Sequence, residues 1–372
     1  MIIQLDDAGL FWEFAPLTLT RPVGNLRVGI MTTDERWNKL TGADISYKTE
    51  EYLSNKFASE AGDIIVNASI IADENLAKAV IELQENTVLV SGDIEIARRG
   101  EVNQTVFYEG DVMKLSKRWH IYQLNGEAIE IDYRILTQGR TGVQLSSTNM
   151  ILGDSTRVFL EEGAKVEGVT LNTSGGPIYV GANAEIMEGS VVRGPLAMCE
   201  SSALKLSAKV YGPTTLGPHC KVGGEVNNVV FYGYSNKGHD GFLGNSVVGE
   251  WCNLGADTNT SNLKNNYGLV KTYSYASRGL EQTDVQFMGL VMGDHSKCGI
   301  NTMFNTATTV GVSANVFGAS FPEKYVPSFS WGETGERFDF DRALVAANNM
   351  MVRRRKELSD DDVAILRHIF DQ

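Results

Sequence analysis

The stretch that decides the fold is "VGANAEIMEGSVVRGPLAMCESSALKLSAKVYGPTTLGPHCKV", residues 180–222. Every sixth residue in it is an aliphatic side chain or Met, beginning at Val180 and Ile186 and ending at Val222. The position four residues after each of these is mostly Ala, Ser, Thr or Cys. A period of six fits neither an α-helix nor a strand of alternating side chains.

This period is typical of a parallel β-helix in which each hexapeptide forms one flat face and three faces close one coil. Hexapeptide repeats predict the left-handed form, an exception to the right-handed crossover rule. After residue 222 the register slips by two and resumes at Val230, and a last block runs from Met292 to Val316. The aliphatic positions, with Asn236 in one slot, are expected to point into the prism: Val230, Asn236, Phe242, Val248, Leu254, Met292, Cys298, Phe304, Val310 and Val316.

The same phase places three of the four cysteines inside the prism. Cys220 and Cys252 fall in the small inward slot and Cys298 in the large one. Since the chain has no CxxC pair, we expect reduced, buried thiols and not nucleophiles.

Two interruptions break the repeat, at 223–230 and at 260–289. Loops that leave a rigid scaffold often carry function, so both interruptions are candidate sites. The first leads into "YGYSNKGHDGFLG", residues 232–244, which brings His239 and Asp240 into the repeat.

The flanking regions have other patterns. Residues 1–145 alternate strand patterns (62–73, 86–99, 101–110) with a helical one (74–84), which predicts a Rossmann-like α/β domain with a mostly parallel sheet. Residues 146–325 are assigned to the β-helix and 326–372 to a helical tail, in which Ser359 caps the last helix.

Composition narrows the classes of function. A net charge of −13 argues against nucleic-acid binding, which needs clustered Lys and Arg. The start, "MIIQLDD", has no basic segment before an apolar one, and no apolar run reaches about 18 residues. A cytoplasmic enzyme acting on small molecules, with no nucleic-acid or membrane partner, is therefore predicted.

Residues 222–262, "VGGEVNNVVFYGYSNKGHDGFLGNSVVGEWCNLGADTNTSN", and "HSKCGIN" at 295–301 resemble a known family in order and spacing. They look like the acetyltransferase domain of the bifunctional N-acetylglucosamine-1-phosphate uridylyltransferase / glucosamine-1-phosphate acetyltransferase family. The resemblance implies acetyl-CoA as cosubstrate, a homotrimer, and His239 as general base. It implies acetyl or substrate contacts at Asn253 and Asn262, an oxyanion contact at the Ala256 backbone, sugar contacts at Glu225 and Asn227, and a coenzyme A channel that includes Gly299, Ile300 and Gly318.

Near the N-terminus, "FAPLTLTRPVGNLRVG" (14–29) resembles the opening of sugar nucleotidyltransferases. The glycine-rich phosphate loop of that family is replaced here by "LDDAGLFWE". Arg21 and Arg27 are candidates for phosphate binding and Asp93 for Mg²⁺. The alternative is a degenerate domain that serves packing or partner binding.

The chain is therefore expected to be an enzyme of nucleotide-sugar synthesis that N-acetylates an amino-sugar 1-phosphate and transfers a nucleotide from UTP or dTTP. Alternatives are nucleotidyl transfer alone, a non-catalytic sugar-nucleotide-binding scaffold, and a zinc hydratase using His219, His239 and His295. Arg353, Arg354 and Arg355 either meet coenzyme A phosphates or form a solvated helix face, and the solvated face is the favoured interpretation.

Overall fold

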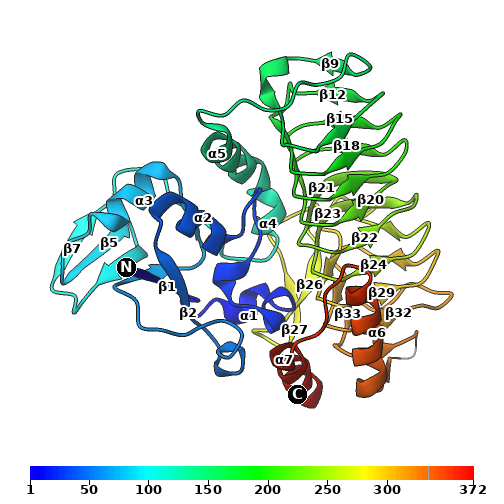
Figure 1. Cartoon of the computed structure of the whole chain (residues 1–372). Helices are drawn as coiled ribbons and strands as arrows, with labels where there is room; N and C mark the ends of the chain where they lie inside the picture. Colours follow the sequence, from blue (N-terminus) through cyan, green and yellow to red (C-terminus); the bar gives the residue numbers. More distant parts are fainter. Residues whose placement is uncertain (334) are drawn as a thin grey trace.

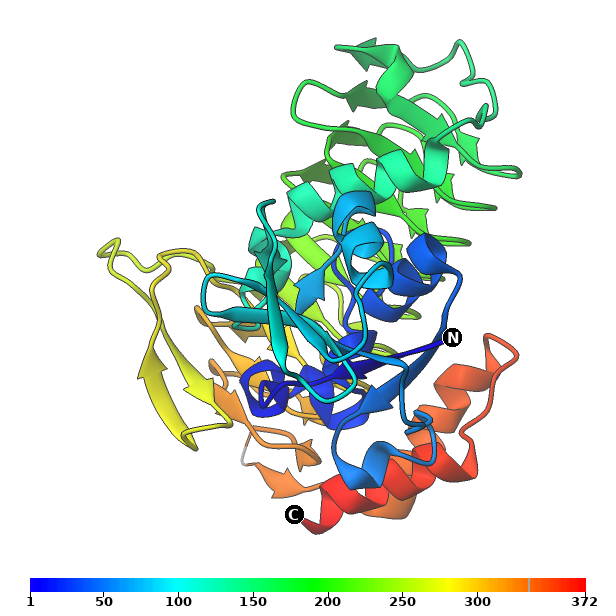
Figure 2. The same ribbon diagram turned by 90° about the vertical axis from the view of Figure 1, so that its left-hand side faces the viewer.

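In the computed structural model, which describes residues 1–333 and 335–372, an α/β unit packs against the side of a tall β-solenoid (Figure 1). The C-terminal helices lie at the lower end of the solenoid. The α/β unit covers one broad side of the stacked coils and leaves other sides open (Figure 2). The predicted pair of folds is confirmed.

The α/β unit is built on a mixed six-stranded sheet of order β2-β1-β3-β6-β5-β7. Pairs β1–β2, β1–β3 and β5–β7 are parallel, whereas β3–β6 and β5–β6 are antiparallel, so the sheet is less parallel than the sequence predicts. The segment 86–99, expected to be one strand, turns back on itself as a hairpin. The strands are β1 (Ile2–Asp6), β2 (Asp44–Lys48), β3 (Ile64–Asn67), β5 (Thr87–Ser91), β6 (Ile94–Arg99) and β7 (Gln104–Phe107), with a separate pair β4 (Ile70–Ile71) and β8 (Met113–Lys114).

Helices of this unit pack on the sheet and against the solenoid. They are α1 (Phe11–Phe14), α2 (Thr33–Thr41), α3 (Glu74–Ile81), α4 (His120–Gln123) and α5 (Asn125–Thr137). Thr32 begins α2 with a complete capping box, and Gly42 ends it with a left-handed φ of 67°. An ion pair between Arg36 of α2 and Asp132 of α5, both fully buried, joins the two helices.

The solenoid has three parallel faces. Face 1 holds β9 (Met150–Leu152), β12 (Thr170–Asn172), β15 (Val191–Arg193), β18 (Lys209–Tyr211), the first halves of β21 (Glu225–Phe231) and β23 (Phe242–Val248), β25 (Asn259–Thr260) and β30 (Met303–Phe304). Face 2 holds β10 (Val158–Leu160), β13 (Ile178–Val180), β16 (Leu196–Met198), β19 (Thr214–Leu216), the second halves of β21 and β23, β28 (Val291–Met292), β31 (Thr309–Val310) and β33 (Tyr325–Val326).

Face 3 holds β11 (Lys165–Val166), β14 (Glu185–Ile186), β17 (Ala203–Leu204), β20 (Lys221–Val222), β22 (Asn236–Lys237), β24 (Asn253–Leu254), β29 (Lys297–Cys298), β32 (Asn315–Val316) and β34 (Ser330–Trp331), closed by the antiparallel β35 (Glu336–Arg337). The left-handed parallel β-helix is as predicted. Its interior is an aliphatic column, and Cys220, Cys252 and Cys298 lie in it.

The inward register differs from the expected one within a single coil. Strand pairing aligns Leu216 with Phe231, Val222 with Lys237 and Val226 with Leu243, so Phe231, Lys237 and Leu243 point inward. The expected inward residues Val230, Asn236 and Phe242 face out. Val230 is nevertheless fully buried, because the α/β unit covers the outer surface of face 2. A strand that is apolar on both sides hides its phase in the sequence.

The physical cause of the slip is a shortened corner between faces 3 and 1. The two preceding coils place four residues between these faces, 187–190 and 205–208, but the coil that ends at Val222 uses only Gly223 and Gly224. Gly224 takes a φ of 73°, and a Cβ there would lie 2.8 Å from the carbonyl oxygen of Gly241. Only glycine fits this corner.

The excursion at 260–289 forms the hairpin β26 (Lys271–Ser274) and β27 (Gly279–Gln282). In Figure 2 this hairpin (yellow) projects to one side of the solenoid and the α/β unit. Arg118, 2% exposed, donates from Nη2 to Thr272 Oγ1 at 2.9 Å and to the Tyr273 carbonyl. Trp119 Nε1 donates to Asp284 at 3.0 Å. The excursion, expected to be a functional loop, therefore fastens the two domains together.

The chain ends in helices α6 (Phe340–Val352) and α7 (Asp360–Asp371). Ser359 caps α7 in a complete capping box with Asp362, as predicted. Among the described residues, no helix combines the length and apolar character that crossing a bilayer requires.

Candidate functional site

A cleft of about 760 Å³ lies over face 3 of the solenoid. It is called the face-3 cleft from here on. Its floor is made by outward side chains of β20, β22, β24 and β29. Helix α6 and the turn that follows it supply the opposite side, through Asn349, Met350, Arg353 and Arg354. His239, Asn253 and Ala256, three of the residues singled out from the sequence, line this one cleft.

His239 stands at the corner between faces 3 and 1. Its side chain is exposed and lines both the face-3 cleft and a second hollow of about 730 Å³, which the shortened Gly223–Gly224 corner borders. Within the described part of the chain the imidazole has no hydrogen-bond partner, and Asp240 does not pair with it. The ring is therefore free to contact a ligand in either hollow.

Asn253 and Ala256 belong to the next coil. The Asn253 side chain points outward from β24 and has no partner among the described residues, so its amide is available to a ligand. The Ala256 carbonyl accepts from the Asn301 main chain at 2.8 Å, whereas the Ala256 N–H donates to no described residue. A free main-chain N–H beside an imidazole is a suitable arrangement for an oxyanion.

The outward side chains on the floor of the cleft form one column, because the strands that carry them pair in register. Lys221 pairs with Asn236, Asn236 with Asn253, and Asn253 with Lys297. Burial and then the nearby Arg354, Lys205 and Arg353 lower the pKa of Lys221. Burial lowers the pKa of Lys297 as well. Both shifts show that the charged form of these lysines is disfavoured in the unliganded protein.

The predicted sugar contacts Glu225 and Asn227 and the predicted substrate contact Asn262 form a separate group at face 1. Glu225 accepts from the Tyr211 hydroxyl at 2.7 Å, and Asn262 donates to Asn245 at 2.7 Å. Asn227 aligns with Gly244 on the neighbouring strand, and a Cβ at Gly244 would lie 2.7 Å from the Asn262 amide nitrogen. These residues lie beyond the His239 corner and do not line the face-3 cleft.

The predicted coenzyme A residues lie along the same corner as His239, further toward the C-terminal end. Ile300 is 71% exposed and lines the face-3 cleft. Gly299 precedes it and packs closely on Phe317, while Gly318 lies one coil further on, beside Glu333. Only Ile300 of the three borders the cleft that contains His239.

The other solenoid histidines lie on a different corner. His219 stacks on Tyr234 with ring centroids 5.1 Å apart, and Tyr234 stacks on Trp251 at 4.1 Å. His295 follows in the same corner and is buried, which lowers its pKa to about 4. Among residues 1–333 and 335–372, no three His, Cys, Asp or Glu side chains form a metal-binding group. A zinc site built from His219, His239 and His295 within one chain does not fit this geometry.

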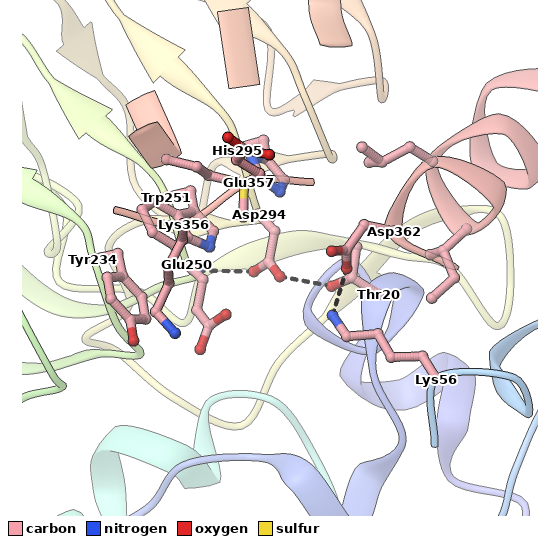
Figure 3. Close-up of a pocket in the computed structure, with 13 residues that line it drawn as sticks. Thr20, Lys56, Tyr234, Glu250, Trp251, Asp294, His295, Lys356, Glu357 and Asp362 are labelled. Atoms are coloured by element: carbon pink, nitrogen blue, oxygen red, sulfur yellow. Dashed lines mark hydrogen bonds and ion pairs between the residues drawn. The ribbon is translucent and has the colours of Figure 1, made fainter. Parts of the chain in front are cut away.

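Arg21 and Arg27 hold the two domains together and are not placed in an open phosphate site. Figure 3 shows the junction, a cavity of about 320 Å³ in which Asp294 bonds to Thr20 and to the Glu250 main chain. The Arg21 guanidinium is buried against Asp294 and lies 3.3 Å from Glu250. Arg27 is likewise buried and donates to the Ile30 carbonyl. Both guanidinium groups have their partners inside the protein, so neither is available to a phosphate.

Asp93 does not lie in a cavity either. It is exposed in the turn between β5 and β6, and among the described residues it belongs to no group of three His, Cys, Asp or Glu side chains that could hold a metal. Asp7, which follows β1, is buried; it accepts from the Val23 main chain and the Thr49 hydroxyl. Burial raises its pKa to about 7. The described residues of this domain therefore do not fit a Mg²⁺ site at Asp93.

The sequence reasoning did not single out the lysines of the floor. Lys221 and Lys297 recur at the outward position of the hexapeptide, directly before inward Val222 and Cys298. A search for outward cations in register on one face would have found them. Arg353 and Arg354, assigned to a solvated face, instead border the cleft.

The fold joins a Rossmann-like α/β domain to a left-handed hexapeptide β-helix. Residues 2–141 match the model of the family described as "Sugar nucleotidyl transferase". The resemblance of residues 14–29 to sugar nucleotidyltransferases is thereby confirmed for the N-terminal domain.

Curated relatives match parts of the chain. The chain is 26% identical over 183 residues to the "Bifunctional protein GlmU" of Synechococcus elongatus, covering 46% of this chain and 36% of that protein. It is 37% identical over 73 residues to the "Bifunctional protein GlmU" of Methanocaldococcus jannaschii, covering 20% of this chain and 17% of that one. It is 24% identical over 162 residues to the "Uncharacterized acetyltransferase YaiX" of Escherichia coli, covering 43% and 70%.

The chain thus spans about a third of the length of the first of these relatives. Among solved structures, the Arabidopsis UDP-N-acetylglucosamine acyltransferase is matched with a TM-score of 0.23 and 14% identity, over 50% of this chain and 67% of that one.

Proposed function

We propose that the protein is an acetyltransferase of nucleotide-sugar synthesis that N-acetylates an amino-sugar 1-phosphate at the face-3 cleft. One observation carries the proposal: His239, Asn253 and the free N–H of Ala256 line a single cleft whose charged lining residues are all cationic. The named relatives, a bifunctional protein GlmU and an acetyltransferase, support it.

The chemistry follows from the groups present. The acceptor amine attacks the thioester carbonyl of acetyl-CoA, and His239 takes the proton that the amine loses. The Ala256 N–H stabilises the negative oxygen of the tetrahedral intermediate, and the Asn253 amide orients the acetyl group or the acceptor. When the carbon–sulfur bond breaks, His239 returns the proton to the departing sulfur, so that free coenzyme A and the N-acetyl product leave.

A homotrimer is part of this proposal. The corner beside His239 presents three exposed apolar side chains, Leu206 at 65%, Ile300 at 71% and Phe317 at 42%. Face 1 remains uncovered by the α/β unit, which packs on face 2. A neighbouring solenoid against this corner would bury the apolar side chains and bring a second wall to the hollows beside His239.

Nucleotidyl transfer by the N-terminal domain is the second candidate activity. The family match over residues 2–141 favours it. Against it, the two arginines expected at the phosphates are committed to the domain junction. Pyrophosphate release from UTP, dTTP or GTP in the presence of a sugar 1-phosphate decides whether this activity is present.

The experiment for acetyl transfer follows thiol release from acetyl-CoA with a panel of amino-sugar phosphates. We expect turnover with at least one acceptor and a loss of about 10²–10⁴-fold in kcat for His239→Gln. His219→Gln is the matched control, since His219 lies on the other corner of the same solenoid, stacked on Tyr234. Absence of turnover with every acceptor, or an unchanged rate in His239→Gln, would refute the proposal.

A further inference from the structure

Five cations converge on the face-3 cleft: Lys205, Lys221 and Lys297 from the solenoid, and Arg353 and Arg354 from the end of α6. No Asp or Glu lines the cleft among the described residues, and none of the five forms an ion pair within 4.0 Å of a described carboxylate. The chain as a whole has a net charge of −13. In so acidic a protein, an uncompensated cationic cluster needs a physical explanation.

The geometry of the floor is specific. Lys221 and Lys297 are separated by the two asparagines Asn236 and Asn253 in one outward column. At the usual strand spacing of about 4.8 Å, the Cα atoms of the two lysines lie roughly 14 Å apart. Two ammonium groups thus flank two amides, an array that matches an elongated anion with several acceptor oxygens.

The dipole of helix α6 explains the position of only two of the five cations, Arg353 and Arg354. Arginines after a helix C-terminus interact favourably with the helix dipole, and α6 ends at Val352. The helix dipole does not explain Lys221 and Lys297, which come from separate coils. Burial lowers the pKa of both lysines and so disfavours their charged forms. Repulsion among the cations persists in the protein alone and is relieved when an anion lies between floor and helix.

We propose that the face-3 cleft is a diphosphate-binding site in which Lys221 and Lys297 hold one side of the group and Arg353 and Arg354 the other. This inference deepens the proposed function, because it places a diphosphate-bearing substrate with its reactive end at the His239 corner. The diphosphate belongs either to the thioester donor or to a nucleotide-sugar acceptor. Both sources present the same chemistry to the cleft.

The test is calorimetric titration of the full chain with inorganic pyrophosphate, without any second substrate. We expect binding that weakens as salt is raised, since the cleft is open to solvent. Arg353→Gln/Arg354→Gln should weaken pyrophosphate binding at least tenfold. Lys297→Gln should do the same from the opposite side of the cleft. These arginines follow α6 at a half-exposed or exposed position, so their removal leaves the packed core intact.

Lys165→Gln is the control, because Lys165 occupies the outward position of β11 on the same face, several coils outside the cleft. Two further arms, coenzyme A and UDP competing against pyrophosphate, identify the donor or the acceptor as the source. Absence of pyrophosphate binding, or equal weakening by Lys165→Gln and the cleft variants, would overturn the inference. Since no turnover is involved, pyrophosphate binding without thiol release would sink only the acetyltransferase proposal.

Discussion

At the scale of single residues, Lys237 is the least expected feature of the solenoid. It is 1% exposed and occupies an inward slot that neighbouring coils fill with Val222 and Leu254. Its ammonium donates to the carbonyl oxygens of His239 at 2.9 Å and Gly223 at 3.2 Å. The shortened corner leaves these two carbonyls without a main-chain donor among the described residues. Lys237 therefore fastens, from inside the prism, the turn that presents His239.

This lysine makes stability depend on pH. Burial lowers its pKa to about 8, so between about pH 8 and its ordinary pKa of 10.5 the unfolded chain holds a proton that the folded chain has released. Stability contributed by this group accordingly rises with pH over that window and is constant below it. The substitution Lys237→Met removes the ammonium group that titrates. We expect the free energy of unfolding of the wild type, relative to this variant, to rise by about 1–2 kcal/mol between pH 7.5 and pH 9.5.

Urea titrations of both proteins at the two pH values measure this difference, and other groups titrate equally in both. If the difference in unfolding free energy between the two proteins does not change with pH, the pKa of Lys237 is not lowered in the folded protein.

The sequence could not reveal this residue. The hexapeptide phase placed Asn236 inward, one position too early, because apolar Val230 was counted as a prism residue when it faces the α/β unit. The family resemblance points to His239, Asn253 and Ala256, and a single cleft does bring them together. Their shared location depends on coil stacking, which one strand's sequence does not encode.

At the scale of secondary-structure elements, α2 and α5 are joined by charge inside the protein. Arg36 Nε lies 2.7 Å from Asp132 Oδ1, and Asp132 Oδ2 also accepts from the main chains of Ile30 and Met31. Both side chains are fully buried. Removing the carboxylate charge leaves a buried guanidinium without compensation.

We expect Asp132→Asn to lower the free energy of unfolding by about 3–5 kcal/mol in urea titrations. The matched control lies two residues further along α5: Arg134 pairs with Glu74 on the surface, where both side chains are well exposed. Arg134→Gln should cost less than about 1 kcal/mol. Equal costs for the two variants would mean that the buried pair does not hold the helices together.

The coils of the solenoid and the last helix were predictable, since they follow from the hexapeptide period and from the capping residue Ser359. The hairpin at 87–99 was not, because the short turn at Gly92–Asp93 reverses a segment whose strand pattern continues on both sides of it. The role of the excursion at 260–289 was also hidden. Its contacts, such as Arg118 with Thr272, join residues more than 150 positions apart.

At the scale of the whole molecule, the α/β unit and the solenoid form one body. The unit's core is continuous with Val230, Val247 and Val291 on the outer surface of face 2. Arg21 of the α/β unit forms an ion pair with Asp294 of the solenoid, and both side chains are buried. Burial alone would lower the pKa of Arg21, but Asp294 and Glu250 more than offset it and raise the value overall.

We expect Arg21→Met to lower the thermal midpoint and to loosen the junction, because Asp294 is left as a buried, unpaired carboxylate. The double variant Arg21→Met/Asp294→Asn should recover part of the loss. Differential scanning calorimetry measures both, and a loss in the single variant that the second substitution does not reduce would contradict the assigned pairing.

Acetyl transfer from the His239 corner is the central claim, and a single-turnover experiment tests it most directly. Wild type and His239→Gln are mixed with acetyl-CoA and the best acceptor, with enzyme in excess, and acetyl product is followed by mass spectrometry. Coenzyme A affinity is measured on the same samples. The account predicts a chemical step slowed by about 10²–10⁴-fold with coenzyme A affinity unchanged. An equal single-turnover rate in the two proteins would contradict it.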